Sequence, residues 1–318
     1  MSRFASHGRI GPKVPGQQAG IMLLAAMFLI VLATTFVSNL LWTNHLEVRR
    51  TRSILAMEQG AQYALAGEAW AAEILNMDRR ESEIDSLEEL WAATPPAFPI
   101  EGGQIIGQIE DLQGRFNLNN LIGANGEKDE AWFLVFQRLL ESLNIEARVA
   151  DQVVDWLDPN QDVEFPNGAE DDVYTGIEPA YRTPNSFITH ASELLAVEAI
   201  TGEVYQLLLP HVTALPPGTL VNINTATGPV IAALSESLSV FDAEAIIEVR
   251  TDQPFAEVAD LDGYVDPDGL PLVTFSTEFF LVTTVVSLDI SRYTMFSVLE
   301  RNPQAGTTVA RLRNLSNE

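Results

Sequence analysis

The residues best suited to chemistry are the carboxylates that crowd positions 155–178. Asp158, Asn160 and Asp162 are spaced so that their oxygens could wrap one hard cation, and turn formers between Pro159 and Gly168 could fold the chain back. Ca²⁺ takes about six to eight oxygen ligands and suits flexible loops. Eight acids and no base occur here: Asp155, Asp158, Asp162, Glu164, Glu170, Asp171, Asp172 and Glu178. The candidate metal ligands are Asp158, Asn160, Asp162, Glu170, Asp171 and Asp172.

A second interpretation of this loop stays open. Its spacing is not that of an EF-hand, because the sixth position lacks glycine and the twelfth lacks glutamate. Crowded carboxylates often serve solubility alone, so a solvated acidic loop is the alternative to a metal site. A further acidic group, Asp262, Asp266 and Asp268, could be a second cation site, but its glycines and proline favour an ordinary turn.

Composition excludes several classes of function. With 18 basic and 44 acidic residues the formal net charge is −26, which disfavours nucleic acid as a partner. There is no cysteine, so disulfides and thiolate metal sites are impossible. The four histidines are far apart in sequence, and no common hydrolase, nucleotide or metalloprotease motif is present. We therefore expect no enzymatic activity, with a membrane-tethered enzyme of unfamiliar site as the alternative. The histidines are His7, His45, His190 and His211.

The N-terminal region predicts a membrane anchor. Residues 21–42 carry no charge and would form a helix of about 33 Å, enough to cross a hydrocarbon core of about 30 Å. The preceding segment is basic and ends in small residues before the apolar run, whereas a secretory signal is cut after it. This order resembles a prepilin leader, which would be cut between Gly20 and Ile21. Prepilins generally carry Glu at the fifth mature position, which here is Ala25.

The rest of the chain predicts a sheet interrupted by helices. A helix should continue through 49–77, with Ala61, Ala64, Leu65, Ala69 or Glu68, Ala72 and Leu75 on one face. Strands are expected at 104–111, 115–119, 278–288 and 293–301, the last two as an antiparallel hairpin. Helices are expected at 129–143, 145–157, 192–198, 203–209, 229–235 and 242–250. Strands on both sides of a helical block indicate one sheet with an inserted helical domain.

Residues 221–255 look like a helix-hairpin-helix module of DNA-uptake proteins. Such modules hold phosphates with the amides of a glycine-rich hairpin. Here the hairpin region, 235–242, contains two acids and no glycine. We therefore expect packing or protein contacts from this segment, and no nucleic acid binding.

Two stretches identify a family. The run from Gln59 to Trp70 and the run from Ile109 to Asn120, together with the leader, resemble the K-type minor pseudopilins of type II secretion systems. The resemblance covers nearly everything from Gly16 to about Arg301. It implies cleavage and methylation by prepilin peptidase, a structural Ca²⁺ cofactor of one or two ions in the helical domain, and a place at the pseudopilus tip. A tip subunit would lack the Glu, since no subunit ahead offers a partner for it.

The resemblance also implies a domain plan and a fold class. The fold is α+β: a long N-terminal helix packed on a small antiparallel sheet, with a large inserted all-helical domain. The expected parts are 1–20 leader, 21–42 transmembrane helix, 43–120 pilin-like helix and first strands, 121–272 inserted domain, 273–302 C-terminal strands and a disordered tail at 303–318.

The functional expectation is a non-enzymatic tip subunit that nucleates or caps the filament and supports export of folded proteins. It would be a single-pass inner-membrane protein with most of its chain in the periplasm. Expected partners are I-type and J-type minor pseudopilins, other pseudopilins and secreted substrates. The alternative is a membrane-anchored, calcium-dependent periplasmic adaptor that does not join a filament.

Overall fold

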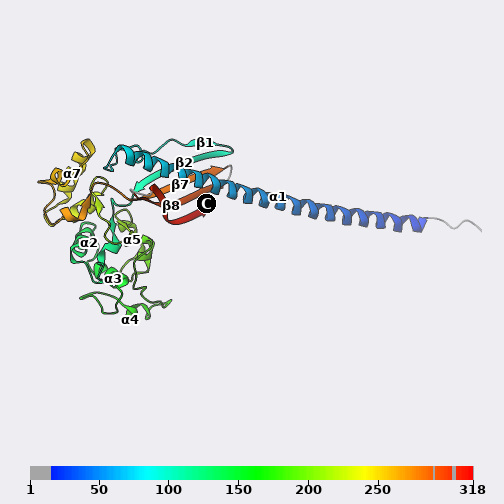
Figure 1. Cartoon of the computed structure of the whole chain (residues 1–318). Coiled ribbons are helices and arrows are strands. Elements are labelled where there is room, and N and C mark those ends of the chain that lie inside the picture. The colour runs from blue at the N-terminus through cyan, green and yellow to red at the C-terminus, as the bar shows by residue number, and fades with distance from the viewer. Residues whose placement is uncertain (1–15, 289–290, 303–305, 318) are drawn as a thin grey trace, which may run out of the picture. The chain divides into compact units, whose positions relative to one another are not determined.

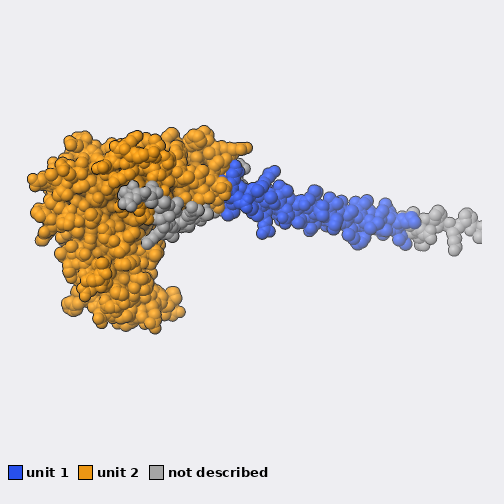
Figure 2. Space-filling view, viewed as in Figure 1, with its two compact units in different colours: residues 1–59 blue, residues 60–318 orange. Residues whose placement is uncertain are grey.

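The computed structural model describes residues 16–288, 291–302 and 306–317. The chain divides into two compact units, residues 1–59 and 60–318 (Figure 2). The helices are α1 (Gly16–Glu81), η1 (Leu118–Leu121), α2 (Glu130–Ser142), α3 (Arg148–Leu157), α4 (Asp171–Tyr174), η2 (Ala191–Ala196), α5 (Gly202–Leu208), α6 (Gly228–Ala233), α7 (Val240–Asp252), η3 (Val258–Leu261) and η4 (Leu270–Leu272). The strands are β1 (Phe98–Ile100), β2 (Gly103–Asp111), β3 (Phe116–Asn117), β4 (Val212–Thr213), β5 (Val221–Asn222), β6 (Val273–Thr274), β7 (Phe279–Leu288), β8 (Ser291–Asn302) and β9 (Gly306–Asn317).

The first unit contains the apolar N-terminal part of α1. This helix is long and apolar enough to cross a membrane, and it is the one helix of that kind in the part of the chain described here. Its large side chains are exposed, among them Ile21, Phe28 and Trp42. Such exposure of apolar surface is typical of a lipid-facing segment. Gly20, Ile21 and Ala25 are exposed on this helix, whereas most of the expected leader, residues 1–15, lies outside the described residues.

In the second unit, the C-terminal part of α1 packs on a five-stranded antiparallel sheet. Its buried face has the periodicity expected from the sequence: Gly60, Ala64, Glu68, Ala71 and Leu75. The sheet supplies alternate side chains, because successive residues of a strand point to opposite faces. Those packed in two clusters with α1 include Ile109, Phe280, Val282, Val286, Tyr293, Met295 and Leu299. Ala69 is exposed and Glu68 is the buried residue of that pair, with its carboxylate accepting a hydrogen bond from Ser297 Oγ.

Close packing of α1 on the sheet depends on small residues. A Cβ atom at Gly67 would lie 2.8 Å from Thr284 Cγ2 and 3.2 Å from Ile105 Cδ1. We expect Gly67→Val to lower the free energy of unfolding by about 1–3 kcal/mol through overpacking. Ala66→Val places the same side chain on the exposed side of the helix and serves as the control. Denaturant unfolding of the full chain in detergent measures both, and equal losses would show that close packing at Gly67 is not the cause.

The sheet order is β1-β2-β7-β8-β9, so strands far apart in sequence lie side by side (Figure 1). β2 and β7 pair over their whole length, from Gly103↔Leu288 to Asp111↔Phe280. The 167 residues between them (112–278) return to the sheet at the point where they left it, as expected for an inserted domain. The β7–β8 hairpin and the α+β class predicted from the sequence are confirmed.

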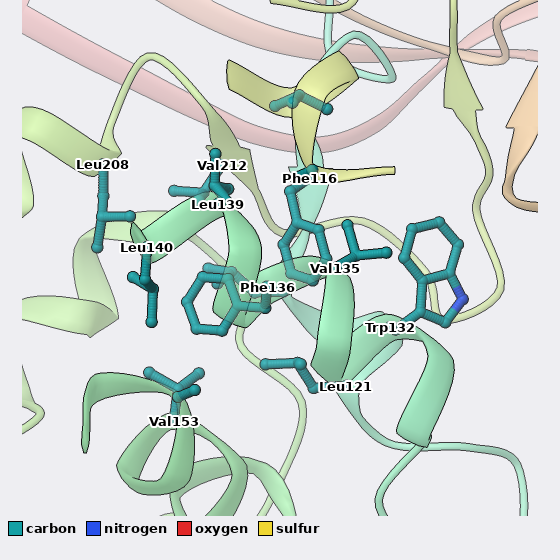
Figure 3. Close-up of a cluster of buried hydrophobic side chains, with 14 of the residues drawn as sticks. Phe116, Leu121, Trp132, Val135, Phe136, Leu139, Leu140, Val153, Leu208 and Val212 are labelled. Carbon is teal, nitrogen blue, oxygen red and sulfur yellow. The ribbon is translucent and has the colours of Figure 1, made fainter. Parts of the chain in front are cut away.

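The inserted domain has the largest hydrophobic core of the described chain. Asp129 caps α2 by accepting hydrogen bonds from the N–H groups of Ala131 and Trp132, and α2 buries a broad apolar face. Figure 3 shows this face meeting residues from η1, α3, α5 and β4. The Phe116 and Phe136 rings stack with centroids 5.0 Å apart. The buried α2 residues are Trp132, Phe133, Val135, Phe136, Leu139 and Leu140.

Two sequence predictions about strands were wrong. The expected tail is not structureless, because Gly306–Asn317 forms β9 along β8, while 303–305 and 318 lie outside the described residues. The strand expected at 115–119 is only Phe116–Asn117, and it does not extend the main sheet. It pairs in parallel with Val212–Thr213 in a separate two-stranded sheet, because the chain turns at the buried Asp111 and enters the inserted domain.

The asparagines that follow β3 satisfy backbone groups. Asn119 Nδ2 donates to the carbonyls of Ile188 and Leu215, and its Oδ1 accepts from the Ile188 N–H. Asn120 Oδ1 accepts from the Gly218 N–H. All of these partners are distant in sequence, so the asparagines hold three segments of the inserted domain together.

Candidate metal centre

The acidic loop lies between α3 and α4, which bring its two ends together. Asp155 is on the last turn of α3, and Asp158 caps that helix with extended backbone. Glu170 is the residue before α4, also extended. All three are buried, although they are carboxylates. Charged groups with so little exposure need opposite charge or several donors nearby.

Within the described residues, some of the buried oxygens in this loop have no hydrogen-bond donor. Five buried polar side-chain atoms lack a hydrogen-bond partner, and three of them are oxygens of this loop region: Asp155 Oδ2, Glu170 Oε1 and Asn185 Oδ1. Asp155 Oδ1 accepts from the Glu164 N–H and Glu170 Oε2 accepts from Thr183 Oγ1. Asn185 Nδ2 donates to the Asn160 carbonyl. An orphaned carboxylate oxygen beside other oxygens is the environment that a hard cation satisfies.

The electrostatics of the loop indicate the same deficit of positive charge. Burial, together with the nearby Asp155, Asp158 and Asp171, raises the pKa of Glu170 to about 7, although the Thr183 hydrogen bond lowers it. Burial also raises the pKa of Asp155 to about 6, with contributions from Asp158 and Glu164. These acids therefore lie near enough to repel one another.

The cations beside the loop are engaged at its margin. Lys128 Nζ bonds Glu164 Oε1 at 2.7 Å and Glu130 Oε1 at 3.1 Å, and lies 4.3 Å from the centre of the Phe133 ring. Arg182 pairs with Asp171 at 2.9 Å but is largely exposed, so the pair adds little. None of these three ion pairs involves the orphaned oxygens.

The structure separates the six candidate ligands into two groups. Asp158 and Glu170 are buried, and the Asp158 carboxylate accepts from the N–H of Asn160, which is itself exposed. Asp162 and Asp172 are exposed, and Asp171 is occupied by Arg182 and Thr183. Sequence spacing missed Asp155 and Asn185. Asp155 belongs to a helix rather than to the loop, and Asn185 lies beyond the acidic stretch; only its left-handed backbone, with φ of 45°, marks it.

A separate acidic cluster at the end of α1 is already paired with an arginine. Asp78, Asp85 and Glu89 each offer an oxygen within 4.8 Å of the others. The buried Arg301 guanidinium bonds Asp78 Oδ2 at 3.0 Å and Asp85 Oδ1 at 2.6 Å, and lies over the Phe280 ring. Burial, together with Glu89 and Asp85, raises the pKa of Asp78 to about 6, although Arg301 lowers it. This cluster therefore joins the end of α1 to β8 without requiring a metal.

A buried polar junction connects the sheet to the inserted domain. Asp111 Oδ2 accepts from Asn222 Nδ2 at 2.9 Å, Thr225 Oγ1 at 2.5 Å and Thr277 Oγ1 at 2.6 Å. Asn222 Nδ2 also donates to the Asp85 carbonyl. Burial raises the pKa of Asp111 to about 6, although all of these hydrogen bonds favour the ionised form. The junction fixes where the inserted domain leaves the sheet.

The remaining candidates have structural roles. His190 caps η2 by accepting from the Ser192 N–H, and His211 Nδ1 contacts Thr227 Oγ1. Asp266 accepts hydrogen bonds from Ser235 and Ser237, in agreement with the turn interpretation of its cluster. In the module that looks like helix-hairpin-helix, Ser239 and Asp242 cap α7 reciprocally.

Comparisons with known proteins agree on one family. Two family models described as type II secretion system, protein K, match residues 114–217 and 221–278. The type II secretion system protein K of Pseudomonas aeruginosa is 32% identical over 299 residues, covering 89% of each chain. The protein of that name from Pectobacterium carotovorum is 30% identical over 320 residues, covering 93% of this chain and 96% of its own.

A solved structure has the same fold. The GspK-GspI-GspJ complex from the type 2 secretion system of enterotoxigenic Escherichia coli contains a chain that matches with a TM-score of 0.72 and 24% identity. The match covers 84% of this chain and 99% of that one. The fold similarity therefore includes the inserted domain as well as the sheet.

Proposed function

Because the chain belongs to the type II secretion system protein K family, we propose that it is a minor pseudopilin at the tip of a secretion pseudopilus. It would be held in the inner membrane by α1 before assembly, with the second unit in the periplasm. It would contact I-type and J-type minor pseudopilins, and so nucleate or cap the filament that supports export of folded proteins.

The observation that carries this proposal is the position of the insertion. The 167 residues between β2 and β7 leave the sheet at the end where α1 also ends, next to Asp78, Asp85 and Arg301. In a helical filament whose subunits stack along their N-terminal helices, added mass at this end obstructs the next subunit. A tip position is therefore the one in which this domain is compatible with assembly.

The first turns of α1 also support a position at the tip of the filament. An ionised Glu inside the apolar segment would cost about 2.5–3.5 kcal/mol unless a partner neutralised it. Ala25 avoids this cost, and a subunit with nothing ahead of it has no N-terminal amine to pair with. The exposed apolar surface of residues 21–42 would contact lipid first and sibling helices after assembly.

We further propose that the acidic loop holds a structural Ca²⁺. Asp155, Asp158 and Glu170 would provide carboxylate oxygens, and Asn185, whose Nδ2 donates to the Asn160 carbonyl, would add its Oδ1. The three orphaned oxygens are the observation that supports this. The ion would supply positive charge that orders the loop between α3 and α4, and would take no part in a reaction.

Mass spectrometry of the protein purified from cells with a complete secretion system tests the function. We expect Ile21 at the N-terminus and co-purification of the I-type and J-type pseudopilins. Gly20→Leu should block cleavage and leave Met1 in place, whereas Gly16→Leu, outside the cleaved bond, should not. An uncleaved native chain would favour a membrane-anchored adaptor instead, and one that begins beyond Trp42 would lack the membrane helix that both functions require.

A further inference from the structure

The outer edge of β2 is covered along only part of its length. β1 pairs with Gly103, Gln104 and Ile105. β1 is the last strand of the sheet on that side (Figure 1), so no strand of the described chain lies beside residues 106–111. A Cβ atom at Gly107 would have no neighbour within 4 Å. Open edges of this kind offer backbone donors and acceptors to another chain.

The register shows which backbone groups face the open side. Ile100 and Gly103 are opposite each other across a two-residue loop, so they exchange the hydrogen bonds of the hairpin. The direction of hydrogen bonding alternates from residue to residue along a strand. The N–H and C=O groups of Gly107 and Ile109 therefore point to the same side as those of Gly103, which is the side of β1. Leu112 lies an odd number of residues from Gly107 and Ile109, so its backbone should face the other side. Its N–H indeed donates to the Phe279 carbonyl on the β7 side at 3.0 Å. The two observations agree.

A cavity of about 230 Å³ lies along this edge. It contacts four consecutive residues of β2, from Gln108 to Asp111. A cavity on one face of a sheet would contact alternate residues, because successive side chains point to opposite faces. Since β7 occupies the other edge, the cavity must lie beside the uncovered one. Its other lining residues are Leu87, Trp91, Ala92, Gly114, Arg115, Pro210, Thr225 and Thr227.

The size and lining of the cavity suit one apolar side chain. Pockets for free small molecules are usually about 300–1,000 Å³, so this one is small. Leu87, Trp91 and Pro210 provide apolar surface, and Leu87 is 52% exposed. The lining base, Arg115, bonds Glu110 at 2.7 Å, and the buried Asp111 carboxylate already accepts from Asn222, Thr225 and Thr277. Because the charged groups of the lining are engaged within this chain, the cavity favours a neutral, apolar side chain.

We propose that the open edge of β2 docks an extended segment of another protein. The segment would add a strand beside residues 106–111, with main-chain bonds to Gly107 and Ile109, and would place an apolar side chain in the cavity. Strand addition gives affinity through main-chain hydrogen bonds and selectivity through such pockets. This proposal does not depend on a place at the tip of a filament.

Photo-crosslinking of the full chain in cells with a complete secretion system tests the edge. A benzoylphenylalanine at position 108, in place of Gln108, is expected to give an adduct that mass spectrometry maps to an extended segment of one protein. The control position is Thr283, which is opposite Gln108 on the covered strand β7. No adduct from position 108, equal adducts from both positions, or an adduct that maps to a helix would overturn the proposal.

Variants of the edge sharpen the test. Gly107→Pro removes an N–H that faces the open side, whereas Gly107→Val keeps it and has room for its side chain. We expect the adduct to fall about fivefold in the first, the effect of one hydrogen bond, and to persist in the second. Leu87→Glu, at a half-exposed position, should reduce it similarly if Gly107→Pro does not fold. Adducts that persist in both Gly107→Pro and Leu87→Glu would refute strand addition.

Discussion

Adding millimolar Ca²⁺ to the full chain in detergent is expected to raise its thermal midpoint, because an ion held only by the folded loop would stabilise the folded state. At a free concentration of about 100–1,000 times the dissociation constant, the gain is about 3–4 kcal/mol. Differential scanning fluorimetry with Ca²⁺ or with EDTA measures it. An unchanged midpoint would remove the metal proposal and leave the solvated acidic loop.

The Ca²⁺ effect should depend on pH in a defined direction. Glu170 and Asp155 have folded pKa values of about 7 and about 6, above their ordinary values of 4.5 and 3.8. Between pH 4 and 7 the metal-free folded state therefore holds more protons than the unfolded state, so its stability falls as the pH rises. Ca²⁺ favours the ionised carboxylates, so its stabilising effect should grow through the same window and level off above about pH 7.

Two substitutions separate the buried ligands from the exposed acids. In EDTA at pH 8, Glu170→Gln should be more stable than the unchanged chain, because it removes a buried and unpaired charge. In Ca²⁺ the order should reverse. Asp172→Asn should change neither result, since Asp172 is exposed and accepts only from its neighbour Val173. A loss of the Ca²⁺ gain in Asp172→Asn would instead favour the ligand set deduced from spacing.

Much of the fold was predictable because its signals are local. The face of α1 follows from small residues at helical spacing, and the β7–β8 hairpin follows from alternation in Phe279–Leu288. The insertion followed from strands on both sides of a helical block. β9 was missed because Gly306–Asn317 mixes polar and basic residues with few apolar ones, and its pairing with β8 decides its conformation.

The site was predictable in place but not in detail. A run of acids marks a loop, yet which carboxylates are buried depends on how α3 and α4 meet. Asp155 looks like an ordinary helix residue in the sequence, and Asn185 lies outside the acidic run. The Asp111 junction was also invisible, because Asn222 and Thr277 are 111 and 166 residues away. Long-range polar contacts of this kind leave no periodic pattern.

Replacing Arg301 by methionine is expected to destabilise the second unit by about 3–5 kcal/mol, because it leaves buried carboxylates without their cation. The Arg301 and Asp85 side chains are 3% and 1% exposed, so water cannot substitute for the guanidinium. Arg301 also donates to the Thr277 carbonyl and so supports the junction with the inserted domain. Denaturant unfolding of the full chain at pH 7.5 measures the loss.

The loss should shrink toward pH 5. The pKa of Asp78 is already about 6 with Arg301 opposing the effect of burial, and it should rise further in the variant, so protonation relieves the unpaired charge as the pH falls. Arg148→Met is the control, because Arg148 makes only exposed ion pairs with Glu146 and Glu198 and should cost at most about 1 kcal/mol. Arg301→Lys keeps the charge but cannot bridge Asp78 and Asp85 with one planar group, so it should fall between the two. A loss in Arg301→Met no larger than that of Arg148→Met would mean that the acidic trio is satisfied in another way, and a metal at Asp78, Asp85 and Glu89 would then become the explanation to test.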